Sequence, residues 1–572
     1  MSANAQVAEI LYELGELYTI KEDKFRSRAF LLAAQRVTSL TEDVRRIRER
    51  GELEKIPGVG KAITAIIEEV LDTGTSVQLE EMREGLPHGV RELMQLEGVG
   101  PKTAMRLNRE LGIGSVEELE KAIKENKLKE LKGFGEKKEE NILKSVEDLR
   151  SHQESFLLGG VLPIIQEIID HMAGSKSVLN VEIAGSARRW KEVVRDLDVL
   201  ASSNDPNATI DRFTKMPWVR RVLSKGSTRS TVILENRLQA DIRVVPPESW
   251  GAALQYLTGS KDHNVKLRTI AVKKGYKLSE YGLYQRKTGK QIAGEDEAEI
   301  YRILGMSWME PELRENRGEI EAAMKDQLPS LVTLKEINGD LHVHTKWSDG
   351  SRSIKEMAEK GMQLGLKYIA ICDHSKSLGI ARGLDEKRMR EQMDEIDELN
   401  EKLDGLTILK GTECDIKADG SLDLPGSVLK DLDYVVGSVH SGFKSSESQM
   451  TERVITALHN DYISTLGHPT GRLIQRRQAY ALNLEKVFEA AAAQRVMMEI
   501  DSFPDRLDLN DVNCRAAKDK GVTMAMGTDS HAPNQIEFLL LGVGVARRGW
   551  LEKGDVINTL SAKDLLRKLR RD

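Results

Sequence analysis

Three short stretches decide the fold at the centre of this chain: VEIAGSARR (residues 181–189), RDLDVL (residues 195–200) and QADIRVV (residues 239–245). Each contains a short apolar run of the kind that forms a β-strand. The first ends in a Gly-Ser turn before two arginines, and such a turn at a helix start can bind a phosphate through backbone N–H groups. The other two carry Asp196, Asp198 and Asp241, and three carboxylates on neighbouring strands can hold two divalent cations. Together they predict nucleotide transfer by two-metal phosphoryl chemistry.

The length and composition are those of a multidomain globular protein. The 572 residues exceed what one hydrophobic core supports, so we expect three to five domains. No apolar run reaches the roughly 20 residues that span a bilayer, and the first twenty residues lack the basic region of a secretory signal. The three cysteines are an odd number and suit a reducing compartment. We therefore expect a cytoplasmic protein that binds no membrane.

The net charge of −6 hides a strong local asymmetry. Residues 212–290 contain 17 Lys and Arg but only 5 Asp and Glu. A basic segment next to a carboxylate metal site is what binding to a phosphate backbone requires. For the basic segment taken alone, a solvated helical face is an equally good interpretation.

Residues 1–150 follow a helical pattern that three similar turns interrupt. The turns are IPGVGK (residues 56–61), LEGVGPK (residues 96–102) and LKGFGEK (residues 131–137). Paired glycines permit a tight turn, and the helix that follows offers unpaired N–H groups to a phosphate. The turns resemble the helix-hairpin-helix motif, which binds the DNA backbone without reading sequence. The resemblance assigns DNA binding to six glycines: Gly58, Gly60, Gly98, Gly100, Gly133 and Gly135.

A second pattern begins at Gly339, where seven apolar, strand-like runs each end in polar residues. The runs lie at residues 341–344, 368–374, 406–413, 434–440, 462–468, 496–501 and 522–531. Helical stretches separate most of them, and strand-helix alternation predicts a parallel sheet that closes into a barrel. In such barrels the chemistry lies at the carboxyl ends of the strands.

Histidines gather at those strand ends. Seven of the 11 histidines follow residue 340, and all but His459 stand at or just beyond a strand end. Asp349, Glu413 and Asp529 accompany them. Mixed imidazole and carboxylate ligands suit Zn²⁺, Mn²⁺ or Fe²⁺ better than Ca²⁺ or Mg²⁺. Grouped metals generate hydroxide and bind phosphate, which predicts phosphoester hydrolysis.

These motifs extend over nearly the whole chain. Residues 1–317 resemble a family X DNA polymerase, and residues 339–572 resemble a PHP (polymerase and histidinol phosphatase) domain. The order is that of bacterial and archaeal family X polymerases with a C-terminal PHP nuclease. The resemblance implies a helical N-terminal region, an α+β palm and thumb, and a seven-stranded, distorted TIM-like α/β barrel. The expected divisions are a lyase-like DNA-binding domain with the first hairpin (1–85), fingers with two further hairpins (86–150), a nucleotidyltransferase palm (151–245), a thumb (246–317), a helical linker (318–335) and a PHP domain (336–572).

The polymerase resemblance assigns roles to individual residues. It implies that Asp196, Asp198 and Asp241 are catalytic and hold two ions of Mg²⁺ or Mn²⁺. The segment YLTGS (residues 256–260) is similar to the family's Tyr-Phe-Thr-Gly-Ser, which lines the sugar of the incoming nucleotide. The implied nucleotide-binding residues are Gly185, Ser186, Arg189, Tyr256, Gly259, Asn264 and Arg268.

The PHP resemblance implies up to three ions of Mn²⁺, Zn²⁺ or Fe²⁺. The first site would use His342, His344, Glu413 and Asp529, with Glu413 bridging to a second ion held by His440 and His468. The third site would use Asp349, His374 and His531. The implied activity is a Mn²⁺-dependent 3′→5′ exonuclease and 3′-end cleaning, and cleavage at abasic sites stays open.

Three positions depart from the family pattern. Family members with 5′-deoxyribose-phosphate lyase activity use a lysine where this chain has Ile66, so that activity has no support here. Gln239 stands where vertebrate members have Arg, and it can still hydrogen-bond Asp241. Leu257 replaces an aromatic residue, which leaves selection between ribose and deoxyribose open.

We therefore expect a monomeric DNA repair enzyme that binds gapped or nicked DNA and dNTPs, fills short gaps and resects 3′ ends. Four alternatives stand beside it: a PHP nuclease with an inactive polymerase core, a small-molecule phosphatase, a scaffold with dead sites and an RNA nucleotidyltransferase. The hairpins and the basic segment argue against a small-molecule enzyme. The complete ligand sets argue against a scaffold.

Overall fold

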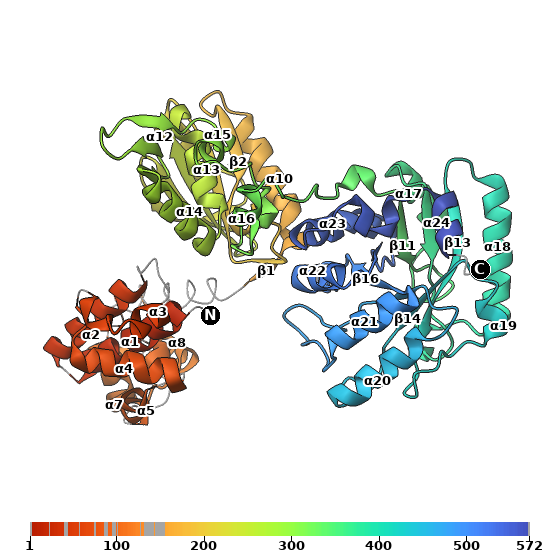
Figure 1. Ribbon diagram of the computed structural model, residues 1–572, viewed down its shortest axis with the longest axis horizontal. Coiled ribbons are helices and arrows are strands. Elements are labelled where there is room, and N and C mark those ends of the chain that lie inside the picture. Colours follow the sequence, from red (N-terminus) through yellow and green to blue (C-terminus); the bar gives the residue numbers. More distant parts are fainter. Residues whose placement is uncertain are drawn as a thin grey trace. The chain divides into compact units, whose positions relative to one another are not determined.

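The computed structural model describes residues 3–21, 23–38, 44–56, 58–73, 76–84, 90–93, 99, 101–125, 127–130, 142 and 155–569 (Figure 1). The chain divides into two compact units, Met1–Glu154 and Ser155–Asp572. Within the residues described, no helix has the length and apolar character needed to cross a membrane.

The first unit is helical and has two hydrophobic cores. One joins buried side chains between Val7 and Met82, and the other joins those between Val90 and Ile142. Its elements are α1 (Ala3–Ile20), α2 (Lys24–Thr38), α3 (Val44–Glu49), η1 (Leu53–Lys55), α4 (Lys61–Thr73), α5 (Val77–Glu84), α6 (Val90–Leu93), α7 (Pro101–Leu111), α8 (Val116–Lys124) and η2 (Lys127–Glu130).

The first predicted hairpin turn precedes α4 directly. Gly58 has a φ of +90°, a left-handed conformation that glycine adopts without strain. The Gly60 carbonyl accepts the N–H groups of Ile63 and Thr64, and so begins the helix. Ile66, the position of the lyase lysine, is buried in the core. The other four hairpin glycines, Gly98, Gly100, Gly133 and Gly135, lie outside the described residues.

The second unit begins with a five-stranded sheet in the order β2-β4-β7-β6-β5. Strands β4 and β7 are parallel, and the other neighbours are antiparallel. Helices α10 and α12 contribute to the core beneath it. The elements are β1 (Phe156–Leu157), α10 (Leu158–Ala173), β2 (Asn180–Ile183), α11 (Gly185–Arg188), β3 (Val193–Val194), β4 (Asp196–Ser202), α12 (Pro206–Thr214), β5 (Val219–Lys225), β6 (Arg229–Leu234) and β7 (Gln239–Val245).

The region after the sheet has a core of its own and a three-stranded sheet, β10-β9-β8. Its elements are η3 (Pro247–Ser249), α13 (Trp250–Thr258), α14 (Lys261–Lys273), β8 (Tyr276–Ser279), β9 (Gly282–Gln285), β10 (Gln291–Ala293), α15 (Glu297–Ile303), η4 (Pro311–Leu313) and α16 (Glu319–Ala323). The expected helical linker over 318–335 is helical mainly in α16, whose Ile320 and Ala323 belong to this core. Proline disfavours a helical conformation at the residue before it, and Pro329 follows soon after α16.

The last part is a barrel of seven parallel strands in sequence order, β11 to β17. The His344 N–H donates to the Ser530 carbonyl over 2.8 Å, which brings the first strand beside the last and nearly closes the barrel. Helices surround the strands in Figure 1. The strands are β11 (Gly339–Val343), β12 (Tyr368–Ile371), β13 (Thr407–Asp415), β14 (Tyr434–Ser438), β15 (Thr465–Leu466), β16 (Met497–Asp501) and β17 (Met524–Gly527). The helices are η5 (Leu334–Glu336), α17 (Ile354–Gln363), η6 (Gly379–Ala381), α18 (Glu386–Lys402), α19 (Gly426–Leu429), α20 (Glu447–Leu458), α21 (Leu484–Gln494), α22 (Asp511–Asp519), η7 (Pro533–Phe538), α23 (Leu539–Arg548), η8 (Lys553–Asp555), η9 (Ile557–Thr559) and α24 (Ala562–Leu569).

The five-stranded sheet and the barrel share one hydrophobic core, which includes Leu158 and Val161 of α10 and Leu541 and Val545 of α23. The approach is close, because a Cβ at Gly159 would lie 2.8 Å from Leu541 Cδ1. Ion pairs add to this contact, including Arg472 to Glu192 at 2.6 Å. The two parts are therefore packed as one body.

Candidate active sites

The strand register brings the three predicted palm carboxylates to one face of the sheet. Asp198 of β4 stands directly opposite Asp241 of β7. Asp196 lies two residues before Asp198 and so on the same face. Gly185 has a φ of +61°, and a Cβ there would collide with the Asp198 carboxylate. Glycine therefore lets the Gly-Ser turn approach the carboxylates closely.

Neighbouring side chains fix Asp241 in place. Gln239 Nε2 donates to Asp241 Oδ2 over 2.6 Å, and the Thr231 hydroxyl donates to Oδ1. Gln239 thus makes the hydrogen bond expected of it. Burial, together with the charges of Asp196 and Asp241, raises the pKa of Asp198 to about 7. Carboxylates crowded in this way fit divalent cations, whose charge relieves the repulsion.

The two arginines of the turn are bound to the region after the sheet. Arg189 Nε donates to Glu315 over 2.9 Å, and its Nη1 donates to the Thr258 carbonyl over 2.7 Å. Arg188 donates to the Thr258 hydroxyl over 2.7 Å and pairs with Glu297 at 3.2 Å. The structure thus joins two motifs that lie about seventy residues apart, the Gly-Ser turn and YLTGS.

The remaining nucleotide-binding candidates lie around α13 and α14. The Asn264 side-chain amide donates to the carbonyls of Tyr256 (2.7 Å) and Gly259 (2.9 Å), so it holds the YLTGS segment in shape. A Cβ at Gly259 would lie 2.6 Å from Asn264 Oδ1, so a residue with a larger side chain would clash there. Arg268 is exposed on α14. The Asn264 side chain is thus already hydrogen-bonded within the protein, which its expected role in nucleotide binding did not anticipate.

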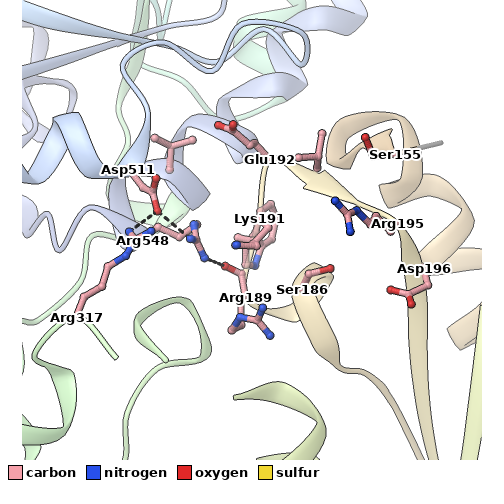
Figure 2. Close-up of a pocket in the computed structure, with 13 residues that line it drawn as sticks. Ser155, Ser186, Arg189, Lys191, Glu192, Arg195, Asp196, Arg317, Asp511 and Arg548 are labelled. Carbon is pink, nitrogen blue, oxygen red and sulfur yellow. Dashed lines mark hydrogen bonds and ion pairs between the residues drawn. The ribbon is translucent and has the colours of Figure 1, made fainter. Parts of the chain in front are cut away.

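A cleft of about 520 Å³ opens beside the carboxylates (Figure 2). Ser186, Lys191, Arg195 and Asp196 line it from the palm side. Arg317, Asp511 and Arg548 line it from the other side. Within residues 155–569, neither Lys191 nor Arg195 forms a side-chain ion pair, so this wall of the cleft suits an anion.

The barrel brings five of the predicted histidine ligands to Glu413. Its carboxylate lies 2.7 Å from His374, 2.9 Å from His468, 3.2 Å from His440, 3.7 Å from His344 and 3.8 Å from His342. Three groups of residues could each hold a metal ion, because the possible ligand atoms within each group all lie within 4.8 Å of one another. The groups are His342–His344–Asp529, His374–Glu413–His440 and His344–Asp349–His374–His531.

This grouping overlaps the expected one without matching it. His374, expected in the third site only, also reaches Glu413, and His344 belongs to two groups. His468 stands outside the groups, although its Nε2 lies within hydrogen-bond distance of Glu413. The sequence could not reveal that His344 and His374 each belong to two groups, because this depends on how far each imidazole ring reaches across the barrel.

Several buried side-chain atoms in the barrel that could bind a metal have no hydrogen-bond partner. They are Nε2 of His342, Nδ1 of His344 and Nδ1 of His468. Orphaned polar atoms are costly in a protein interior, and metal coordination satisfies them. Burial and the charges of His531 and His374 lower the pKa of His344 to about 3, so this ring is neutral, the form that binds a metal. The residues therefore fit the implied metals.

Two supporting carboxylates were missed from the sequence. Glu499 Oε1 lies 2.6 Å from His342 Nδ1, and its Oε2 accepts the His468 N–H over 2.6 Å. Asp415 lies 2.8 Å from His440 Nδ1. A carboxylate on one ring nitrogen leaves the other free for a metal. The available signal was a charged residue inside an apolar strand, as in VMMEID (residues 496–501).

Comparison with known proteins agrees with these regions. The model of a helix-hairpin-helix domain matches residues 2–76, and that of a SAM-like helix-hairpin-helix tandem matches residues 90–148. The DNA polymerase beta thumb matches residues 253–315, and the PHP domain matches residues 340–502. The chain is 37% identical to a Bacillus subtilis protein named DNA polymerase/3′-5′ exonuclease PolX, over 96% of each chain. It is also 31% identical to a probable phosphatase of a Thermoanaerobacter species, over 38% of this chain and 89% of that protein.

Proposed function

Because the chain belongs to the family X DNA polymerases that carry a PHP domain, we propose that it extends and resects DNA 3′ ends at two separate sites. The observation that carries the proposal is similarity to one such enzyme over 96% of both chains, with the ligand residues of both sites present. The substrate is DNA, and we assign gap filling with dNTPs to the palm and 3′→5′ exonuclease activity to the barrel.

The expected domain divisions would supply the parts of this activity. The helix-hairpin-helix region would hold the DNA backbone around a gap. The five-stranded sheet would serve as the palm, and the region with α13 to α16 as the thumb. We place the boundary between thumb and linker after α16 rather than at residue 317, because α16 packs in the thumb core.

In the palm, Asp196, Asp198 and Asp241 would hold two ions of Mg²⁺ or Mn²⁺. When bound, these ions activate the primer hydroxyl and neutralise charge on the triphosphate. Thr231 and Gln239 fix the rotamer of Asp241, so the carboxylate is oriented before substrate arrives. The Ser186 turn would receive the triphosphate.

In the barrel, the histidines and carboxylates around Glu413 would hold up to three ions of Mn²⁺, Zn²⁺ or Fe²⁺. Such ions supply a hydroxide nucleophile near neutral pH and clamp the phosphodiester. Glu499 and Asp415 orient His342 and His440, so their Nε2 atoms face the ligand cluster. Glu413 is central, and the surrounding imidazoles overcome the effect of burial and hold the pKa of its carboxyl well below the usual range.

The barrel supports a second candidate function. Its relatives include probable phosphatases that match most of their own length, which favours phosphomonoester hydrolysis by the same ligand cluster. Abasic-site cleavage, which hydrolyses a phosphodiester of the backbone, is a further candidate reaction of the same ligand cluster. Lyase activity is not proposed, since Ile66 offers no amine.

A primer labelled at its 5′ end and annealed at a one-nucleotide gap tests the proposal. Wild type, Asp198→Ala and His344→Ala are incubated with Mn²⁺ and all four dNTPs. We expect Asp198→Ala only to shorten the primer and His344→Ala only to extend it. Shortening by wild type with no extension at any dNTP concentration would contradict the polymerase assignment. Resection that survives in His344→Ala would contradict the assignment of the barrel. A parallel reaction on a sugar phosphate without DNA tests the phosphatase alternative.

A further inference from the structure

The last residue of barrel helix α23 reaches into the triphosphate-binding turn of the palm. Arg548 is buried, with 6% of its surface exposed. Its Nη1 donates to the Arg189 carbonyl over 2.6 Å, and its Nη2 donates to Asp511 over 2.8 Å (Figure 2). Its Nη1 also donates to Glu315 over 3.1 Å. We propose that Arg548 is a positioning residue through which the nuclease domain shapes the nucleotide-binding turn of the polymerase.

A second contact from the same helix supports this. Trp190 follows Arg189 directly and has a φ of +55°, in the left-handed region that an indole side chain rarely adopts. Its ring lies against Gly544 of α23, where a Cβ would come within 2.5 Å of Trp190 Cε3. The end of the turn is thus held at two adjacent residues by two positions one helical turn apart on α23.

The charges around Arg548 alternate. Glu315 lies between Arg189 and Arg548, at 2.9 and 3.1 Å, and Asp511 lies between Arg548 and Arg317, both at 2.8 Å. Burial would raise the pKa of Glu315, but Arg189 and Arg548 lower it overall. Glu315 is therefore a carboxylate whose charge two arginines share.

This sharing matters for the nucleotide. The Nη2 of Arg189 has no hydrogen-bond partner within residues 155–569, and Arg189 lines the cleft next to Ser186. Without Arg548, Glu315 would pair with Arg189 alone and compete with an incoming triphosphate for its guanidinium. The carbonyl at the end of the turn would also lose its donor. Both effects would weaken nucleotide binding and leave the palm carboxylates untouched. The inference rests on the polymerase function proposed above.

The test measures single-nucleotide gap filling with Mg²⁺ in full-length protein, and compares wild type with Arg548→Gln and Arg548→Lys. We expect Arg548→Gln to raise the KM for dNTP about tenfold and to change kcat by less than about twofold, as for the loss of a ground-state contact. Arg548→Lys keeps the charge near Glu315 but cannot reach all three acceptors, so its KM should be intermediate.

Arg547→Gln is the matched control. Arg547 is the preceding residue of α23 and also contacts the thumb region, at Glu312 over 2.6 Å, but it does not touch the turn. Its KM for dNTP should match wild type. The rate at which each variant resects a single-stranded primer with Mn²⁺ is the control for folding. This rate should equal that of wild type in all three variants.

An unchanged KM in Arg548→Gln would overturn the inference, as would an equal rise in Arg547→Gln, which would indicate general loosening of the interface. If Arg548→Gln resects no DNA, it is misfolded and Arg548→Lys decides: a KM equal to that of wild type rejects the inference. Failure of wild type to extend any primer would instead reject the polymerase function itself.

Discussion

The palm and the barrel both gather ligands for divalent cations, yet they do so in opposite ways. The palm offers three carboxylates on one sheet face, and among the described residues they do not form a set whose donor atoms all lie within 4.8 Å. The barrel offers three such sets, largely buried and built mainly from imidazoles. We therefore expect substrate phosphates to complete the ion coordination in the palm, and the protein alone to supply most of the ligands in the barrel.

The difference teaches how one chain can keep two phosphoryl-transfer sites distinct. Carboxylate oxygens with room for water and phosphate suit Mg²⁺. Imidazoles favour Mn²⁺, Zn²⁺ or Fe²⁺. Ligand type thus predicts different ion preferences at the two sites, with Mn²⁺ able to serve both.

The largest expected effect separates the two sites by metal. After exhaustive treatment with a chelator, addition of Mg²⁺ alone should restore primer extension but leave resection at least about 100-fold below its Mn²⁺ level, because the barrel ligands are mostly imidazole. Gel assays of extension and resection in the two metals measure this. His344→Ala should extend normally in either metal and resect in neither. Equal recovery of both activities in Mg²⁺ would remove the basis of the comparison.

The next effect concerns buried ion pairs, in which the charge of Glu297 is neutralised by arginines rather than by a metal ion. Glu297 pairs with the buried Arg314 and with Arg188, so Glu297→Gln should lower the free energy of unfolding by about 3 kcal/mol at neutral pH. Burial would raise the pKa of Glu297, but the two arginines lower it to about 2. Its stabilising effect is therefore complete above the unfolded pKa and is lost as the pH falls below it.

Urea unfolding of both proteins measures that effect. The difference between wild type and Glu297→Gln should be smaller at about pH 4 than at about pH 7. Glu299→Gln is the control, since its ion pair with Arg302 lies on the exposed face of the same helix. A difference independent of pH would show that the Glu297 charge is not the cause.

A smaller effect tests whether the barrel is held in shape by the residues behind its ligands. Glu499→Gln should weaken metal binding by roughly 10- to 100-fold, because the amide cannot hold His342 Nδ1 and the His468 N–H equally well. Titration with Mn²⁺ and the metal dependence of resection measure this. Extension is the internal control and should be unchanged. Normal Mn²⁺ affinity in this variant would mean that the histidines are positioned by packing alone.

The smallest effect lies behind the palm carboxylates. Gln239→Ala removes one of the two donors to Asp241 and leaves Thr231 in place, so kcat for extension should fall by about threefold to tenfold. Single-turnover extension measures it, with resection as the control. A loss as large as that of Asp198→Ala would indicate that Thr231 alone cannot hold the Asp241 carboxylate in place.

Most of the architecture could be predicted from the sequence, because its signals are local. Alternation of strands and helices after Gly339 predicted the parallel barrel, and the sequence-ordered strands confirm it. The helical N-terminal region, the thumb and the PHP domain are confirmed by the family matches as well. The helical linker is shorter than predicted. Pro329 was an available signal against a helix continuing through residue 328, although α16 already ends at Ala323.

What could not be predicted depends on contacts between distant segments. Glu499 and Asp415 look like ordinary strand residues until the barrel places them behind His342 and His440. The arginine at the end of α23 joins segments more than two hundred residues apart. No short motif records such pairings, because the partners meet only when the barrel strands assemble or when the palm packs against the barrel.

The core shared by α10 and α23 also bears on how the chain is made. Leu158 and Val161 are synthesised nearly four hundred residues before their partners Leu541 and Val545. At ordinary translation rates the apolar face of α10 waits uncovered for roughly tens of seconds. Exposed apolar surface of this kind binds chaperones or aggregates. The growing chain thus exposes this apolar face on the ribosome, after the polymerase half has emerged and before the last helices arrive to cover it.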